Sequence, residues 1–212
     1  HTEEKVQTDS IMNIIHKTSS TQKLELLKDH IDAYPNNTTF IQELEKEANI
    51  QNDYLSLAIV NINKTYHFVK AGNTDSTHYY LNKIEENLSL LNEKKGGPTS
   101  LSTKDFERYK KIRRILISTK VTAYINEGKY NLALIEMRRA QEDEMLIQDK
   151  LFESQGYLLL GYIYLYMDKE EEALKNFSIS STLESQHRKT NPNPGGYNFY
   201  SPMEGSIIAL GM

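Results

Sequence analysis

The stretch that decides the fold is GYLLLGYIYLYMDKEEEALKNF, residues 156–177, in which a tyrosine-rich apolar run turns abruptly acidic. The apolar run, Tyr157 to Met167, has about half of the residues that a membrane-spanning helix needs. The acidic run from Asp168 to Glu172 suits a solvated turn and the first turn of a following helix, where the helix dipole favours negative charge. We therefore expect two packed helices here, and no membrane insertion.

The same helical signature extends along most of the chain. Apolar residues recur every three or four positions, and short turn signals interrupt them. No segment shows the strict alternation of a half-buried strand, so the sequence predicts an all-α chain of antiparallel helical hairpins. One expected helix begins at Ser20 or Thr21 and ends before Pro35, and another begins near Ser102, a cap with Asp105 three residues on. The other expected helices cover residues 39–48, 53–71, 74–93, 129–148, 151–167 and 169–186.

Composition excludes several classes of function. A formal charge of −4 over 212 residues gives no general attraction for nucleic acid or anionic lipid. The chain has no cysteine, which removes disulfides, thiolate metal sites and cysteine nucleophiles. No two of the six histidines have the i,i+4 spacing of a helical metal pair, and no phosphate loop or nucleophile elbow is present. We predict no catalytic, cofactor or metal site, so this region is not an enzyme, although a catalytic domain could follow it.

The quoted stretch also contains a spacing that recurs in the chain. Gly161 is preceded by Leu160 and followed by Tyr164, Ala173 and Phe177 at three, twelve and sixteen residues. This spacing resembles the tetratricopeptide repeat, in which a small residue lets two helices cross closely and aromatic residues fill the gap. A degenerate second copy lies upstream, at Val121, Tyr124, Gly128, Tyr130, Ala133, Met137 and Ala140. A weaker third copy comprises Thr65, Phe68, Gly72, Thr77, Leu81 and Ile84.

The resemblance implies a domain organisation. Residues 1–190 would form a right-handed α-solenoid, with its clearest repeats at about 114–150 and 151–187 and a degenerate one at 53–93. Residues 191–212 would be a loop and the start of a further helix, because Leu210 and Gly211 repeat Leu160 and Gly161. We accordingly expect a truncated array whose exposed terminal repeat allows self-association.

The resemblance also implies a concave groove lined by the first helix of each hairpin. Helical spacing from the packing positions assigns the groove residues as Tyr66, Lys70, Ser118, Thr122, Asn126, Tyr162 and Tyr166. The alternative for the last two is that they pack on a flanking loop or on the missing next repeat. A basic stripe of Lys104, Arg108 and Lys111 either extends the groove toward an acidic or phosphorylated partner or forms a solvated face neutralised by glutamates.

We expect this region to be a non-catalytic module that binds a protein or peptide segment, and not nucleic acid. The resemblance implies the sensory or regulatory input region of a larger bacterial signalling protein, outside the cytoplasm rather than inside it. Two alternatives remain open: a small-molecule sensor with a closed pocket among the tyrosines, and a free-standing adaptor. No cofactor is implied.

Overall fold

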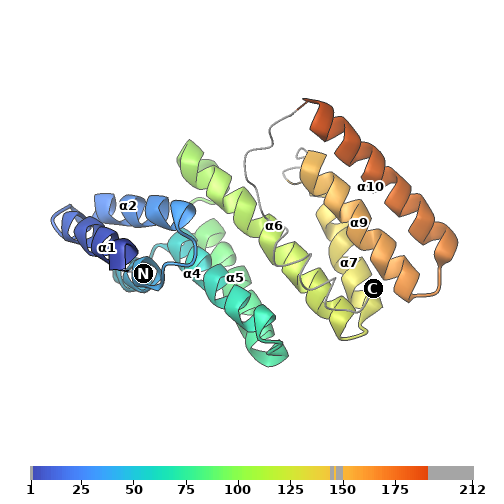
Figure 1. Ribbon diagram of the computed structural model, residues 1–212, viewed down its shortest axis with the longest axis horizontal. Coiled ribbons are helices and arrows are strands. Elements are labelled where there is room, and N and C mark those ends of the chain that lie inside the picture. Colours follow the sequence, from blue (N-terminus) through green and yellow to red (C-terminus); the bar gives the residue numbers. More distant parts are fainter. Residues whose placement is uncertain (1, 144–145, 147–149, 191–212) are drawn as a thin grey trace. The chain divides into compact units, whose positions relative to one another are not determined.

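The computed structural model describes residues 2–143, 146 and 150–190. These residues form nine α-helices and one short 3₁₀ helix, with no strand among them, which confirms the predicted all-α class (Figure 1). The chain divides into two compact units, residues 1–106 and residues 107–212. Each unit is described by itself, and the predicted helix at residues 201–212 lies outside the described residues.

The first unit contains five α-helices and the beginning of a sixth. They are α1 (Thr2–Ile15), α2 (Ser20–Ala33), α3 (Thr38–Gln51), α4 (Tyr54–Lys70) and α5 (Thr74–Lys94), followed by the 3₁₀ helix Pro98–Ser100 and the first turn of α6 (Thr103–Asn126). Apolar side chains of α1 to α4 form one core cluster, in which Leu27, Phe40 and Leu44 are fully buried. The core therefore contains an apolar stripe of α2, formed by Leu24, Leu27 and Ile31.

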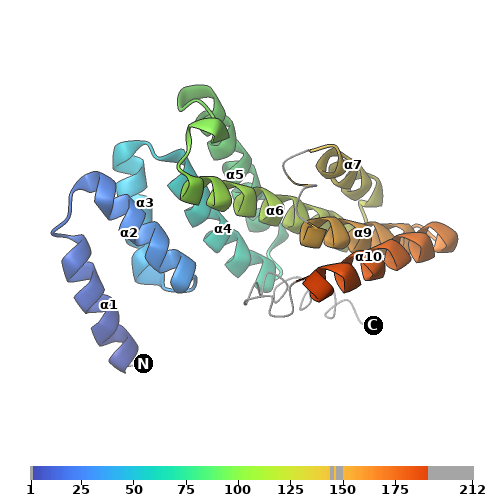
Figure 2. The ribbon, with the colours of Figure 1, turned by 90° about the horizontal axis from the view of Figure 1, so that it is seen from above.

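The second unit contains the rest of α6, then α7 (Tyr130–Gln141), α9 (Lys150–Tyr166) and α10 (Glu170–Thr190). Helix α9 contacts both α7 and α10 (Figure 2). One buried cluster joins Val121 of α6, Met137 of α7 and Ile163 of α9. The core thus follows the apolar faces that the sequence predicts.

Polar side chains fix the helix starts. Asn37, Asp53 and Asn73 accept hydrogen bonds from backbone N–H groups in the first turns of α3, α4 and α5. The predicted cap of α6 is confirmed, because Asp105 N donates to Ser102 Oγ at 3.2 Å. The cap position of α2 is Ser19 and not Ser20 or Thr21, and its side chain makes no capping hydrogen bond.

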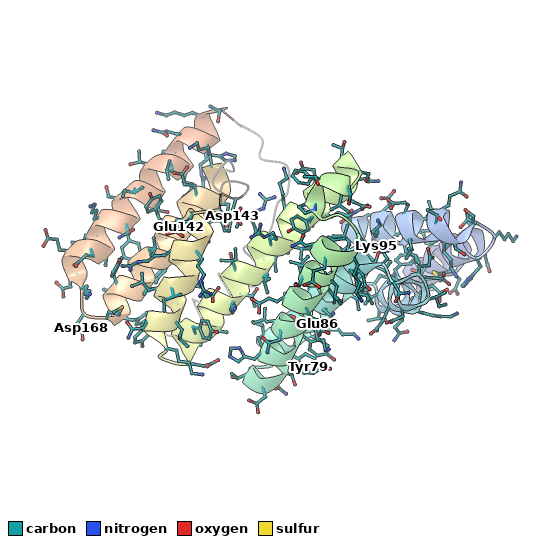
Figure 3. The ribbon with its side chains drawn as sticks, turned by 180° about the vertical axis from the view of Figure 1, so that it is seen from behind. Tyr79, Glu86, Lys95, Glu142, Asp143 and Asp168 are labelled. Atoms are coloured by element: carbon teal, nitrogen blue, oxygen red, sulfur yellow. The ribbon has the colours of Figure 1, made fainter. Side chains whose placement is uncertain are left out.

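Two features differ from the prediction. Helix α1 was not expected, because its first residues are mostly polar; Met12 and Ile15 in its second half belong to the core. Helix α7 ends at Gln141, although the predicted helix ran to residue 148. Glu142 and Asp143 follow it (Figure 3), and negative charge is unfavourable at a helix C-terminus.

Candidate functional site

Helices α9 and α10 approach closely at Gly161. A Cβ at this position would lie 2.3 Å from Phe177 Cε1, so the ring of Phe177 occupies the space that any other side chain would need. Tyr162 meets the same ring edge-on, with centroids 5.2 Å apart. The predicted small residue and the predicted aromatic therefore contact each other.

A hydrogen bond joins the same two helices further along. Ser154 Oγ lies 3.0 Å from the carbonyl oxygen of Ser180 and donates to it, and both serines are buried. Ala173, the second small residue of the predicted repeat, is also buried, at 1% exposure. The packing at Phe177 and the Ser154–Ser180 hydrogen bond thus join α10 to α9 at two places along the hairpin.

Helix α9 packs against α7 through a different set of side chains. Gly156 lies against Met137, whose Cε would be 3.2 Å from an added Cβ. Tyr166 stacks on Tyr130 with centroids 5.7 Å apart and ring planes 8° from parallel. Met137, which stands in the degenerate copy where Phe177 stands in the last copy, is fully buried.

The two tyrosines of α9 that were predicted to line the groove therefore pack against neighbours within the second unit. Tyr162 and Tyr166 are separated by one helical turn, and both are half-buried. Tyr162 is held by Phe177 of α10 and Tyr166 by Tyr130 of α7. Each ring has a fixed orientation and keeps part of its surface exposed.

The residues predicted on α6 are less accessible. Ser118 and Thr122 are buried, at 6% and 5% exposure, and the Thr122 hydroxyl donates to the Ser118 carbonyl at 2.9 Å. Asn126 is exposed and Lys111 is half-buried. In this unit the predicted groove residues that keep accessible surface are therefore Lys111, Asn126, Tyr162 and Tyr166.

Three of the predicted residues belong to the first unit. Tyr66 is half-buried and meets His67 edge-on, with centroids 5.9 Å apart. Lys70 is exposed at the end of α4. Lys104 is ion-paired with Asp29 of α2. The predicted groove residues are thus divided between the two units.

The basic stripe has a structural role over much of its length. Arg108 is buried, at 4% exposure. Two basic neighbours that do not belong to the stripe are also paired: Lys110 lies 2.6 Å from Glu107, and Arg113 is ion-paired with Asp143, which follows α7. Together with the Lys104–Asp29 pair, these contacts favour the interpretation of a neutralised face over a free phosphate-binding surface.

Sequence reasoning missed a buried cation in the first unit. Lys28 Nζ lies 2.7 Å from Asp105 Oδ1 and 2.5 Å from Glu25 Oε1, and the lysine side chain is only 2% exposed. In the sequence, Lys28 lies on the same helical face as Leu24, Leu27 and Ile31. This position is the sequence feature that could have indicated a buried lysine. The contact connects α2 to the first turn of α6.

A second ionic cluster connects α2 to α3. Lys23 Nζ lies 2.8 Å from Glu43 Oε1 and 2.6 Å from Glu47 Oε1. Burial by itself would raise the pKa of Glu43, but the hydrogen bond and charge of Lys23, with smaller contributions from Lys46 and His16, lower the pKa overall. Burial by itself would lower the pKa of Lys23, and its two carboxylate partners raise it.

Neither ionic cluster has the composition of a metal centre. Among the residues that the structure describes, no group of three histidine or carboxylate side chains is arranged to hold a metal ion. In the same residues, no helix combines the length and the apolar character that crossing a membrane requires.

Comparison of the chain with protein-family models, curated proteins and solved structures finds no match.

Proposed function

We propose that α6, α7, α9 and α10 form two hairpins of a right-handed, tetratricopeptide-like α-solenoid. The proposal is supported by the contact between Gly161 and Phe177 and by the burial of Ala173. In the degenerate copy the equivalent positions Val121, Ala133 and Met137 are buried as well. The buried alanine recurs on both hairpins, as Ala133 and Ala173, while valine and methionine stand in the degenerate copy where Gly161 and Phe177 stand in the last one.

The function that this packing supports best is non-catalytic docking of a protein or peptide segment on the exposed face of α9. The observation that carries it is the pair of half-buried tyrosines, Tyr162 and Tyr166, each packed against a neighbouring ring. Tyrosines are enriched at the energetic centres of interfaces, and side chains already fixed in orientation lose little entropy on binding.

The test is selection of peptides from a display library on the whole chain, followed by affinity measurement on variants. Tyr162→Ala and Tyr166→Ala should each weaken the selected peptides by about tenfold or more. Tyr79→Ala removes an exposed tyrosine of the first unit and is the matched control. Tyr166→Phe keeps the stacked ring and should bind nearly as wild type. Failure to enrich any peptide that depends on α9 would refute the proposal.

From the resemblance we further propose that this module is the sensory or regulatory input region of a larger bacterial signalling protein. The native reading frame tests this placement. A membrane span followed by a kinase or DNA-binding domain would support it, and a reading frame that encodes only this region would leave an adaptor instead.

A further inference from the structure

Helix α10 has a continuous exposed stripe that no other described helix covers. Its residues are separated alternately by three and four positions, which places them in one line along the helix. All of them are exposed. They are Glu171, Leu174, Ser178, Ser181, Ser185 and Arg188.

The largest side chain of this stripe is unusually accessible. Leu174 is 70% exposed, the highest value among the exposed large apolar side chains of the described residues. The next three residues along the stripe, Ser178, Ser181 and Ser185, are small, and small residues allow the backbone of a second helix to approach closely. An exposed leucine bordered by small side chains is suited to packing against another helix.

The charges at the two ends of α10 are opposite. Its first turn carries Glu170, Glu171 and Glu172, and its last turn carries His187, Arg188 and Lys189. In the described part of the chain Glu171 has no ion-pair partner, and Arg188 contacts only Glu184 of its own helix, at 2.5 Å. An arginine has five N–H donors, so Arg188 can contact a second carboxylate without losing the first.

The stripe is complementary to itself when a second copy runs antiparallel. In one register Glu171 faces Arg188 of the other copy, Leu174 faces Ser185, and Ser178 faces Ser181. A two-fold axis generates each of these contacts twice, because the two copies use the same surface. The antiparallel direction also sets the acidic first turn of each helix against the basic last turn of the other.

From this pattern we propose that α10 is a homodimerisation surface, and that its partner is the α10 helix of a second copy of this chain. Charge complementarity identifies the partner as a second copy of the helix. The register that pairs Glu171 with Arg188 also places Leu174 against the small residue Ser185. Because only one leucine per copy is buried, the charged ends determine both the strength and the direction of pairing. The inference is independent of peptide docking on α9.

A charge-reversal experiment tests the pairing on the whole chain. Glu171→Lys brings two positive side chains together at both contacts, and Arg188→Glu brings two negative side chains together. Each variant alone should raise the dimer dissociation constant by about tenfold or more, as measured by sedimentation equilibrium. Mixing the two variants should restore dimers, because each contact in the mixed pair again joins opposite charges. Both positions are exposed, and circular dichroism checks that each variant is folded.

Cross-linking gives a second measurement that reports the register directly. The chain has no cysteine, so Ser178→Cys and Ser181→Cys each introduce a unique thiol. On air oxidation a mixture of the two should form a disulfide faster than either variant alone, and faster than a mixture of Ser178→Cys with Leu132→Cys on α7. A chain that stays monomeric at all concentrations overturns the proposal. So does a dimer that is unchanged by both charge reversals, which would mean that another surface mediates association.

Discussion

Gly161 has no Cβ, and a Cβ at this position would lie only 2.3 Å from Phe177 Cε1. A glycine inside a helix destabilises that helix, so its presence in α9 indicates that helix packing at this position outweighs helix propensity. The resemblance of this spacing to the tetratricopeptide repeat implied this role, because in that family a small residue lets two helices cross closely and an aromatic fills the gap. It could not predict that Ser118 and Thr122 are buried, since both are polar and periodicity does not distinguish the sides of a polar face.

Replacing Gly161 by alanine should therefore destabilise the protein. The matched control is Gly156→Ala on the same helix, where the nearest atom is the flexible end of Met137 at 3.2 Å. Both substitutions gain the same helix propensity, so the difference between them isolates overpacking. We expect Gly161→Ala to unfold at lower urea concentration and to be less stable than Gly156→Ala by about 2 kcal/mol. Equal stability of the two variants would contradict the close approach.

Glu43 gives a prediction for acid stability. Its pKa is lowered below the ordinary value of 4.5, so its stabilising effect is present above that pH and is lost as the pH falls through the lowered pKa. Wild type and Glu43→Gln should differ most in unfolding free energy near neutral pH and converge as the pH falls below about 4. Glu86→Gln, which removes an exposed pair with Lys83, should show little of this dependence. A constant difference across the pH range would exclude the Lys23 contact as the cause.

Individual helices follow from local sequence more closely than the contacts between them do. Capping side chains mark the starts of α3, α4 and α5, and glycines with positive φ, such as Gly72 and Gly128, mark turns between helices. The contact between Lys28 and Asp105 has no such local signal, because 77 positions separate the two residues. A lysine next to an apolar stripe is ordinarily solvated, and only the folded first unit brings Asp105 to it.

The buried lysine gives the element-scale prediction. Lys28→Met removes the cation and leaves Asp105, which is mostly covered, without it. The expected loss in unfolding free energy is about 3 kcal/mol, measured by chemical denaturation. Lys104→Met is the control, because its pair with Asp29 is largely exposed and should contribute about 1 kcal/mol or less. A Lys28→Met variant as stable as this control would show that the α2–α6 contact does not stabilise the fold.

At the scale of the whole molecule, periodicity shows which face of each helix is buried but not which helix it meets. The predicted groove residues illustrate the difference, since Tyr162 and Tyr166 share one helix of the second unit while Tyr66 and Lys70 belong to the first. Helix α6 begins in the first unit and continues without interruption into the second. A continuous helix of this kind has no Pro or Gly that would mark the boundary between the two units in the sequence.

Salt dependence separates specific pairing of α10 from general association of the chain. At pH 7 the net charge of −4 makes two copies repel each other, and added salt screens this repulsion, which favours unspecific association. Pairing through Glu171 and Arg188 depends on attraction between opposite charges, and salt weakens it. Between about 0.05 and about 0.5 M salt we expect the dimer dissociation constant from sedimentation to rise. In Arg188→Glu the α10 contacts repel instead, so the little association that remains should strengthen with salt. Association that strengthens with salt in wild type as well would be unspecific, and α10 would then not be its cause.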